Sequence, residues 1–122
     1  MSAPQPVLRG IFLTSEAPAK TARFYRDVAG VDLEQVGTSD TYVYWRIDRG
    51  GLQLAIHDAK AFAGYTYPAR PDSNLTHLYF QIPSQADFLA HLDRLEITPL
   101  LRDDVVVTVV DPDGRKVMFG TA

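Results

Sequence analysis

Residues 105–119 read VVVTVVDPDGRKVMF, and this stretch decides the fold. Two runs of strand-forming residues, 105–110 and 116–119, flank the tetrapeptide DPDG at 111–114. Proline in the second and glycine in the fourth position of such a tetrapeptide are typical of a type I turn. The stretch therefore predicts a β-hairpin, and its second strand carries a methionine, Met118, between two apolar residues.

The chain has 122 residues, no cysteine and a formal net charge of −3. This length suits a single domain, 1–122, with a core of its own. Without cysteine there is no disulfide, thiolate metal ligand or cysteine nucleophile, which fits a reducing, cytoplasmic setting. The charges form no basic run, so we expect no nucleic-acid or membrane partner. The start lacks the apolar segment of a signal peptide, and no apolar run reaches the roughly 20 residues of a membrane span.

Two similar series of elements follow one another along the chain. Alternating or continuous apolar residues predict strands at 8–14, 31–36, 41–47 and 52–57, and again at 75–82, 97–101, 105–110 and 116–119. Each series contains one helix directly after its first strand. The order strand, helix, three strands thus occurs twice, which predicts a diverged internal duplication of one βαβββ unit and an α+β fold. We place module 1 at about 7–57, a linker at about 58–74 and module 2 at about 75–122.

Both helices carry start and stop signals. The first begins near Ser15, and Gly30 is placed to end it in the left-handed conformation. The second begins at Ser84, with Asp87 three residues later in the capping-box position. Helical spacing predicts the buried stripes Ala17, Thr21, Phe24 and Val28 in the first helix, and Phe88, Leu92 and Leu95 in the second.

Strand alternation assigns side chains to the two faces of each predicted sheet. The face toward the helix is apolar, and we assign to it Ile11, Leu13, Val43, Ile47, Leu52, Leu54, Ile56, Leu78, Phe80, Ile82, Val117 and Phe119. The opposite face combines aromatic and polar groups, and we assign to it Gly10, Phe12, Tyr42, Tyr44, Arg46, Gln53, Ala55, His57, His77, Tyr79, Gln81, Lys116 and Met118. Such a mixture is typical of a ligand pocket.

Two motifs resemble those of a known family. FYRDVAG at 24–30 is similar to a helix ending FYxxxLG, and DPDG at 111–114 is similar to the family's hairpin. With the duplicated βαβββ unit, these motifs resemble the vicinal oxygen chelate superfamily, which contains glyoxalase I, extradiol dioxygenases, fosfomycin-resistance enzymes and bleomycin-resistance proteins. The resemblance implies two βαβββ modules that form a U-shaped half-barrel cavity, and a homodimer.

The resemblance also implies where a divalent ion would be bound in metal-using members. The corresponding positions in this chain are Gly10, Gln53, His77 and Met118. Glycine has no ligand, the Gln53 amide is neutral, and a thioether does not suit Zn²⁺, Mn²⁺, Mg²⁺ or Fe²⁺. A single imidazole is short of the three protein ligands of a catalytic zinc site. We therefore predict no metal at this position and no metal cofactor.

The leading hypothesis is a metal-free protein that binds a small, partly aromatic molecule, an antibiotic being one example. The predicted ligand-binding residues are Phe12, Tyr44, Arg46, Gln53, His77, Tyr79 and Met118. The alternative is a metal-dependent or His77-assisted lyase, isomerase or dioxygenase, in which His77 is the best catalytic candidate. A third reading is a dimerisation scaffold.

Purely structural roles stay open for several of these residues. His77 is alternatively a hydrogen-bonded side chain without function inside the cavity. Tyr79 is alternatively a side chain that fills the cavity, and Arg46 a solvated residue at the sheet edge. His57 is expected at the rim of the cavity, and His57, His77 and Asp58 form an alternative metal set. Trp45 is expected to be core.

Overall fold

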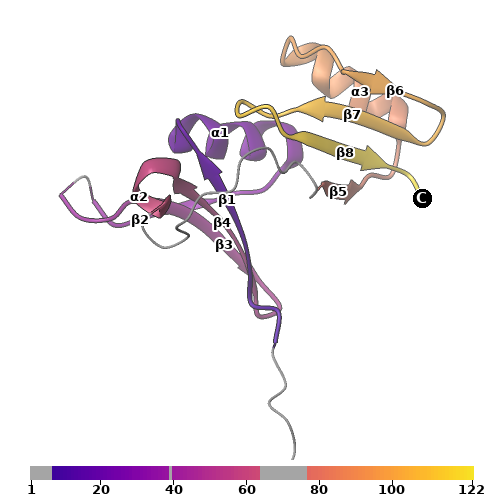
Figure 1. Ribbon diagram of the computed structural model, residues 1–122. Coiled ribbons are helices and arrows are strands. Elements are labelled where there is room, and N and C mark those ends of the chain that lie inside the picture. Colours follow the sequence, from indigo (N-terminus) through magenta and orange to yellow (C-terminus); the bar gives the residue numbers. More distant parts are fainter. Residues whose placement is uncertain (1–6, 39, 64–76) are drawn as a thin grey trace, which may run out of the picture.

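The computed structural model describes residues 7–38, 40–63 and 77–122. Their helices and strands follow the order that the sequence predicts, with one short helix added (Figure 1). The elements are β1 (Gly10–Ser15), α1 (Pro18–Ala29), β2 (Glu34–Val36), β3 (Tyr44–Arg49), β4 (Leu52–Asp58), α2 (Ala59–Ala63), β5 (Leu78–Gln81), α3 (Gln85–Arg94), β6 (Leu101–Arg102), β7 (Val106–Val110) and β8 (Lys116–Gly120). In this part of the chain, no helix is long and apolar enough to cross a membrane.

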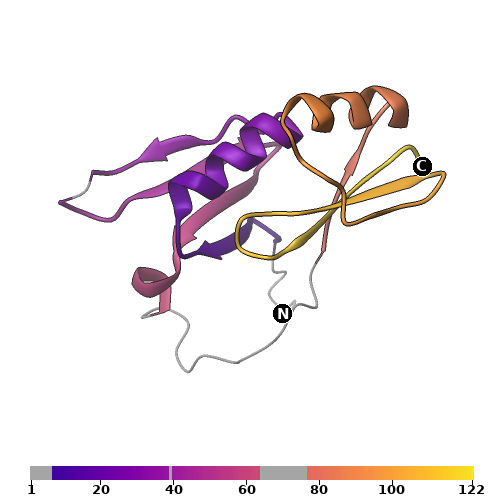
Figure 2. The same ribbon diagram turned by 90° about the horizontal axis from the view of Figure 1, so that it is seen from above.

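The two halves build the same sheet twice. The first sheet has the order β1-β4-β3-β2 and the second has the order β5-β8-β7-β6. In each sheet the outer strand β1 or β5 runs parallel to its neighbour, and the other pairs are antiparallel. Figure 2 shows α1 and α3 on one side of the molecule, each over its own sheet, and α2 at the end of the first sheet. The predicted duplication of a βαβββ unit is confirmed.

The ends of the helices follow the predicted signals in part. Gly30 has φ +69° and ends α1 in the left-handed conformation, as predicted. The Ser84 side chain accepts a hydrogen bond from the Asp87 backbone N–H at 3.2 Å and caps α3. Ser15 does not cap α1, because the helix begins three residues later and its Ncap residue is Ala17. The Ser15 hydroxyl instead accepts from the Ala17 backbone N–H at 3.0 Å, so it shapes the approach to the helix.

The core lies between each helix and its sheet. In the second module the Phe119 ring stacks on Phe88 of α3 at 4.4 Å and on Phe80 of β5 at 5.3 Å. In the first module Tyr25 is fully buried and Phe24 only partly, whereas the helical stripe predicted Phe24 as the buried residue. Tyr25 takes the interior position because its hydroxyl has a buried partner in the other module, Asp111.

A polar joint connects the two modules at the DPDG hairpin. The Tyr25 hydroxyl donates to Asp111 Oδ2 at 2.8 Å, and Arg115 Nη1 donates to the same oxygen at 2.8 Å. Asp113 accepts hydrogen bonds from the Thr21 hydroxyl and from the Glu16 backbone N–H. Both motifs that resemble the family, at 24–30 and 111–114, therefore meet in one structural contact.

Asp111 is 3% exposed and also organises its own hairpin. Its Oδ1 accepts from the backbone N–H groups of Asp113 and Arg115, and its carbonyl accepts from the Gly114 N–H at 3.0 Å. This last bond is the one expected for the predicted type I turn. A second contact between the modules joins the helices, since His91 Nε2 of α3 donates to the Asp27 carbonyl of α1 at 2.7 Å.

Several boundaries differ from the prediction. The strand predicted at 97–101 is the two-residue β6, and β2 and β3 each begin three residues later than expected. Residues 59–63 of the predicted linker form α2. Part of the strand predicted at 75–82 and most of the linker lie outside the described residues.

Candidate functional site on the open sheet faces

We call the sheet face that α1 or α3 does not cover the open face. Strand register places the predicted residues of the first module together on it. Gly10 pairs with Gln53, Phe12 with Ala55, Arg46 with Ala55, and Tyr44 with His57. The alternation in the sequence thus predicted the composition of this face correctly.

An aromatic ring covers the first family metal position. Gly10 and Gln53, two of the positions implied by the resemblance, are cross-strand neighbours. A Cβ added at Gly10 would lie 2.5 Å from Cε1 of Phe12, so the Phe12 ring occupies the space that a side chain at Gly10 would need. The ring itself is 51% exposed on the open face. The position that corresponds to a metal ligand in the resembling family is therefore part of an apolar surface.

The second module also carries an exposed aromatic ring over a glycine, although this glycine is not one of the four positions. Met118 is half-buried on β8 and pairs with Tyr79, while His77 is exposed and precedes β5. The Tyr79 ring lies over Gly120, where an added Cβ would meet the Tyr79 hydroxyl at 2.3 Å. That hydroxyl donates to the Ala122 carbonyl at 2.8 Å, and the residue is 44% exposed.

The side chains at these positions do not fit a catalytic metal ion. They offer one imidazole, one neutral amide and one thioether, without an anionic ligand to offset the dehydration of the ion. In residues 7–38, 40–63 and 77–122 no three His, Cys, Asp or Glu side chains gather closely enough to hold a metal. The alternative set His57, His77 and Asp58 is not brought together either, and Asp58 accepts from the Ala61 backbone N–H at 3.0 Å.

His57 is the centre of an aromatic cluster on the open face. Its ring stacks on Tyr44 with centroids 4.8 Å apart and 8° between the planes. Phe62 of α2 lies 4.6 Å away and Phe12 of β1 lies 5.2 Å away. The Tyr42 hydroxyl is 2.8 Å from His57 Nδ1. His57 is only 8% exposed and lies one residue before the end of β4.

Burial determines the protonation of His57. Desolvation disfavours the imidazolium and lowers the pKa of His57 below its ordinary value. Its Nε2 is buried and has no hydrogen-bond partner in the described part of the chain. The sequence placed His57 on the correct face through its alternation with Gln53 and Ala55. It gave no sign that Phe62, from a segment predicted to be linker, would cover the ring.

Arg46 lies beside this cluster and already has counter-charges. Its guanidinium is 2.6 Å from Asp48 and 3.4 Å from Glu34, both of which are exposed carboxylates. Its Nε is buried and, in the described residues, has no partner. With two carboxylates beside one guanidinium, the surroundings of Arg46 carry no excess positive charge for an anionic ligand.

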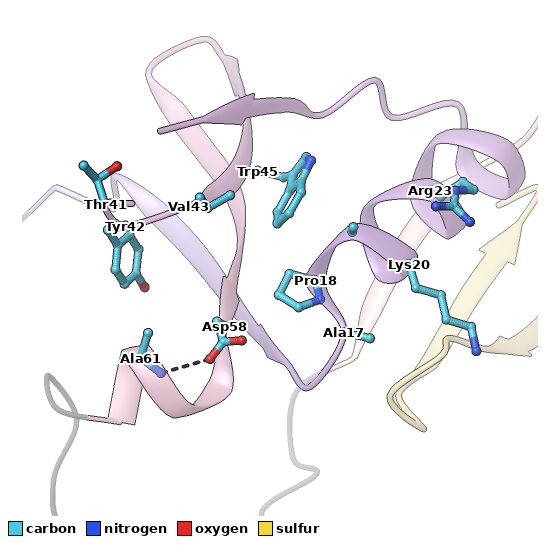
Figure 3. A pocket seen from close by; sticks show the side chains of 11 residues that line it. Ala17, Pro18, Lys20, Arg23, Thr41, Tyr42, Val43, Trp45, Asp58 and Ala61 are labelled. Atoms are coloured by element: carbon cyan, nitrogen blue, oxygen red, sulfur yellow. Dashed lines mark hydrogen bonds between the residues drawn. The ribbon is translucent and has the colours of Figure 1, made fainter. Parts of the chain in front are cut away.

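A separate hollow of about 550 Å³ lies on the α1 side of the first sheet. Figure 3 shows Trp45 directed from β3 toward Pro18 at the start of α1, with Lys20 and Arg23 farther along the helix. Trp45 is partly buried and packs against the core, as expected. Since Trp45 alternates with Tyr44 along β3, this hollow opens on the other side of the sheet from Gly10 and Gln53.

Many solved structures have a similar fold. No protein-family model and no curated protein matches the chain. A lactoylglutathione lyase from Agrobacterium tumefaciens is 21% identical with a TM-score of 0.64, and the match covers 98% of this chain and 95% of that chain. A glyoxalase-related enzyme from Fulvimarina pelagi is 20% identical with a TM-score of 0.69, covering 96% and 88%.

A glyoxalase/bleomycin resistance protein/dioxygenase from Nocardioides is 12% identical with a TM-score of 0.67, covering 97% of this chain and 84% of that chain. At such identities the likeness concerns the fold, since one fold carries many activities. The two modules, their strand orders and these near-complete superpositions confirm what the motifs predicted: the chain has the fold of the glyoxalase, bleomycin-resistance and dioxygenase proteins, the vicinal oxygen chelate superfamily.

Proposed function

We propose that this protein binds a small, partly aromatic molecule on its open sheet faces without a metal ion. One observation carries the proposal: an exposed aromatic ring lies over a glycine on each open face, Phe12 over Gly10 and Tyr79 over Gly120, and Met118 is the strand partner of Tyr79. Rings and a thioether suit an apolar ligand, whereas they offer nothing to a hard cation. Gln53, Arg46 and His77 supply the polar groups that orient such a ligand.

We further propose that the protein acts as a homodimer. Phe12 and Tyr79 are about half exposed in the single chain, which is unusual for large aromatic side chains on a sheet face. A second copy that covers these faces would turn two shallow surfaces into enclosed cavities. The absence of cysteine suits a reducing compartment, and we propose that the protein is cytoplasmic.

Metal analysis of protein purified without chelator tests the first part. We expect less than stoichiometric zinc, manganese, nickel and iron, and no change in Tm on adding these ions. A matched variant, Gln53→Glu with Met118→Glu, restores carboxylates at two family positions and should gain a metal-dependent Tm shift. Stoichiometric metal that is lost in His77→Ala, or turnover of a hemithioacetal or catechol that stops with EDTA, would contradict the proposal and support the enzyme.

A thermal-shift screen against antibiotics and aromatic metabolites tests the binding. Hits should lose their effect in Phe12→Ala and Tyr79→Ala. Trp45 provides an internal control, because it lines the hollow on the α1 side. A ligand that quenches Trp45 fluorescence and is insensitive to both alanine variants binds in that hollow, which would contradict a site on the open face. Light scattering on the same samples measures whether the protein is a dimer.

A further inference from the structure

We propose that His57 is the polar anchor of the open-face ligand, and that its Nε2–H donates a hydrogen bond to the carbonyl oxygen of a neutral aromatic molecule. This inference rests on the proposed function and adds the chemical class of the ligand. It follows from four observations: the hydrogen bond at Nδ1, the missing partner at Nε2, the aromatic surroundings and the distribution of charge.

We assign the tautomer of His57 by taking the Tyr42 hydroxyl as the donor in their contact. A neutral imidazole has one N–H donor and one bare nitrogen acceptor. A phenol hydroxyl is a good donor, and Nδ1 lies 2.8 Å from the Tyr42 oxygen. When Tyr42 donates to Nδ1, the ring proton of neutral His57 is on Nε2. The Tyr42 contact therefore prepares Nε2 as a hydrogen-bond donor.

That donor is unsatisfied. Nε2 is buried, and in the described part of the chain it has no hydrogen-bond partner. Buried side-chain donors are paired in the large majority of cases, and an unpaired one destabilises the fold. The tilted Phe62 and Phe12 rings offer an N–H···π contact, which is weaker than a bond to oxygen. A ligand oxygen would supply the missing acceptor.

The surroundings select a neutral aromatic ligand. The described groups that contact the His57 ring are Phe12, Tyr42, Tyr44 and Phe62, and none of these is charged at neutral pH. The nearby cation, Arg46, is already paired with two carboxylates. An anionic ligand would thus lose its hydration without gaining a counter-charge. A carbonyl on an aromatic ring loses less hydration and can stack on the same rings.

Because Nε2 is buried, a ligand must displace a neighbouring group to reach it, and we propose that this group is Phe62. Phe62 comes from the five-residue helix α2 and covers the His57 ring at 4.6 Å. A bound aromatic ring can take the place of the Phe62 ring and preserve its apolar contacts. Binding should therefore change the environment of Phe62 more than that of Tyr44, which stacks against His57 from β3.

The tautomer is tested without a ligand. Nitrogen-15 NMR of the histidine rings of the intact protein distinguishes a protonated from a bare Nε2. We expect His57 to be neutral at pH 7 with its proton on Nε2, and to lose this tautomer preference in Tyr42→Phe. A proton on Nδ1 in the wild-type protein would overturn the inference.

Matched probes test the ligand class. Acetophenone presents a carbonyl, α-methylstyrene replaces that oxygen with a methylene of the same shape, and benzoate adds a charge. We expect acetophenone to bind roughly 3- to 10-fold more tightly than α-methylstyrene in NMR titrations, as one neutral hydrogen bond predicts. Benzoate should bind more weakly than acetophenone. In His57→Phe the two neutral probes should bind equally. If His57→Phe does not fold, Tyr42→Phe replaces it, and its preference for acetophenone should be smaller than that of the wild type.

The outcomes separate this inference from the proposed function. Equal affinities for acetophenone and α-methylstyrene in the wild type overturn the role of His57 and leave an open-face binder in place. A preference that persists in His57→Phe also overturns it. No binding of either probe contradicts the inferred ligand class, whereas only a failed wider screen contradicts the binding function.

Discussion

Tyr25 and Asp111 belong to the two motifs that resemble the family, and both are structural in this protein. Tyr25 is fully buried, and its hydroxyl donates to the carboxylate of Asp111 across the boundary between modules. Burial, followed by the neighbouring negative charge, raises the pKa of Tyr25 far above its ordinary value, so Tyr25 stays neutral at every physiological pH. Such residues explain why these motifs indicate the fold and say little about activity.

Tyr25→Phe removes only this hydroxyl. Because the lost hydrogen bond is to a buried carboxylate, we expect the free energy of unfolding to fall by about 1.5–3 kcal/mol in denaturant titrations. Tyr79→Phe is the matched control, since its hydroxyl also donates one bond but on a partly exposed side chain. Tyr79→Phe should lower the free energy of unfolding by less than about 0.5 kcal/mol. Equal effects of the two variants would argue against the joint as a source of stability.

The burial of His57 should make the free energy of unfolding depend on pH. Its pKa is lowered in the folded protein by burial, while in the unfolded chain it titrates near about 6.5. Below that pH the unfolded state binds more protons than the folded state. As the pH falls from about 6.5, the free energy of unfolding should therefore decrease until the pH is below the folded-state pKa. His57→Phe should flatten this part of the profile, as measured by urea unfolding between pH 5 and 8. The exposed His77→Phe serves as control; an identical flattening there would contradict the assignment.

Strand alternation in the sequence predicts the face of each side chain, but it does not predict the tertiary contacts of that side chain. Alternation placed Phe12, Tyr44, Arg46 and His57 on one face, and the structure agrees. It could not show that Phe62 covers His57 or that the Phe12 ring lies over Gly10. Those facts depend on tertiary packing and on the chosen rotamer, which local periodicity does not determine.

Among the secondary-structure elements, those with strong local signals were predicted best. Ser84 and Asp87 define the start of α3, and Gly30 defines the end of α1. The short α2 was missed because five residues of sequence AKAFA, beside glycine and proline, are below the length at which periodicity is informative. The apolar run at 97–101 resembles a strand, yet only 101–102 pair with β7. Edge strands such as β6 are short in many proteins, which limits pairing with other chains.

Ser84→Ala tests the cap of α3. The Asp87 N–H would lose its acceptor, and we expect a decrease of about 1 kcal/mol in the free energy of unfolding. Ser84→Asp keeps an acceptor at the same position and places a negative charge at the helix start, so it should retain wild-type stability. Thermal melts of both variants measure the effect. A loss in Ser84→Asp equal to that in Ser84→Ala would show that the hydroxyl has a different role.

For the whole molecule, the hydrogen bonds of the DPDG hairpin connect the two modules. Asp113 connects to Thr21 and Glu16, and Asp111 connects to Tyr25. The sequence predicted the duplication and the superfamily fold from order and motifs. It did not predict that DPDG would serve as the joint, because its turn residues are sufficient to explain a hairpin.

Weakening the joint should separate the two modules on unfolding. Trp45, the single tryptophan, lies in the first module, so its fluorescence reports on that half, whereas circular dichroism reports on both. We expect the two signals to coincide in the wild type and to give different midpoints in Thr21→Val combined with Asp113→Ala. Thr108→Val, within the second sheet, is the control and should keep coincident transitions. Coincident signals in the double variant would mean that apolar packing alone couples the modules.

The rings that lie beside Gly10 and Gly120 also affect how such a protein can change over time. A histidine introduced at Gly10 would enter a space already taken by the Phe12 side chain, and it would find no carboxylate nearby at Gln53 to help hold an ion. A single substitution at Gly10 thus displaces the Phe12 ring without creating a metal site. Several simultaneous changes would be needed before an ion stayed bound on this face, so no single mutation at these positions is expected to turn the protein into a metalloprotein.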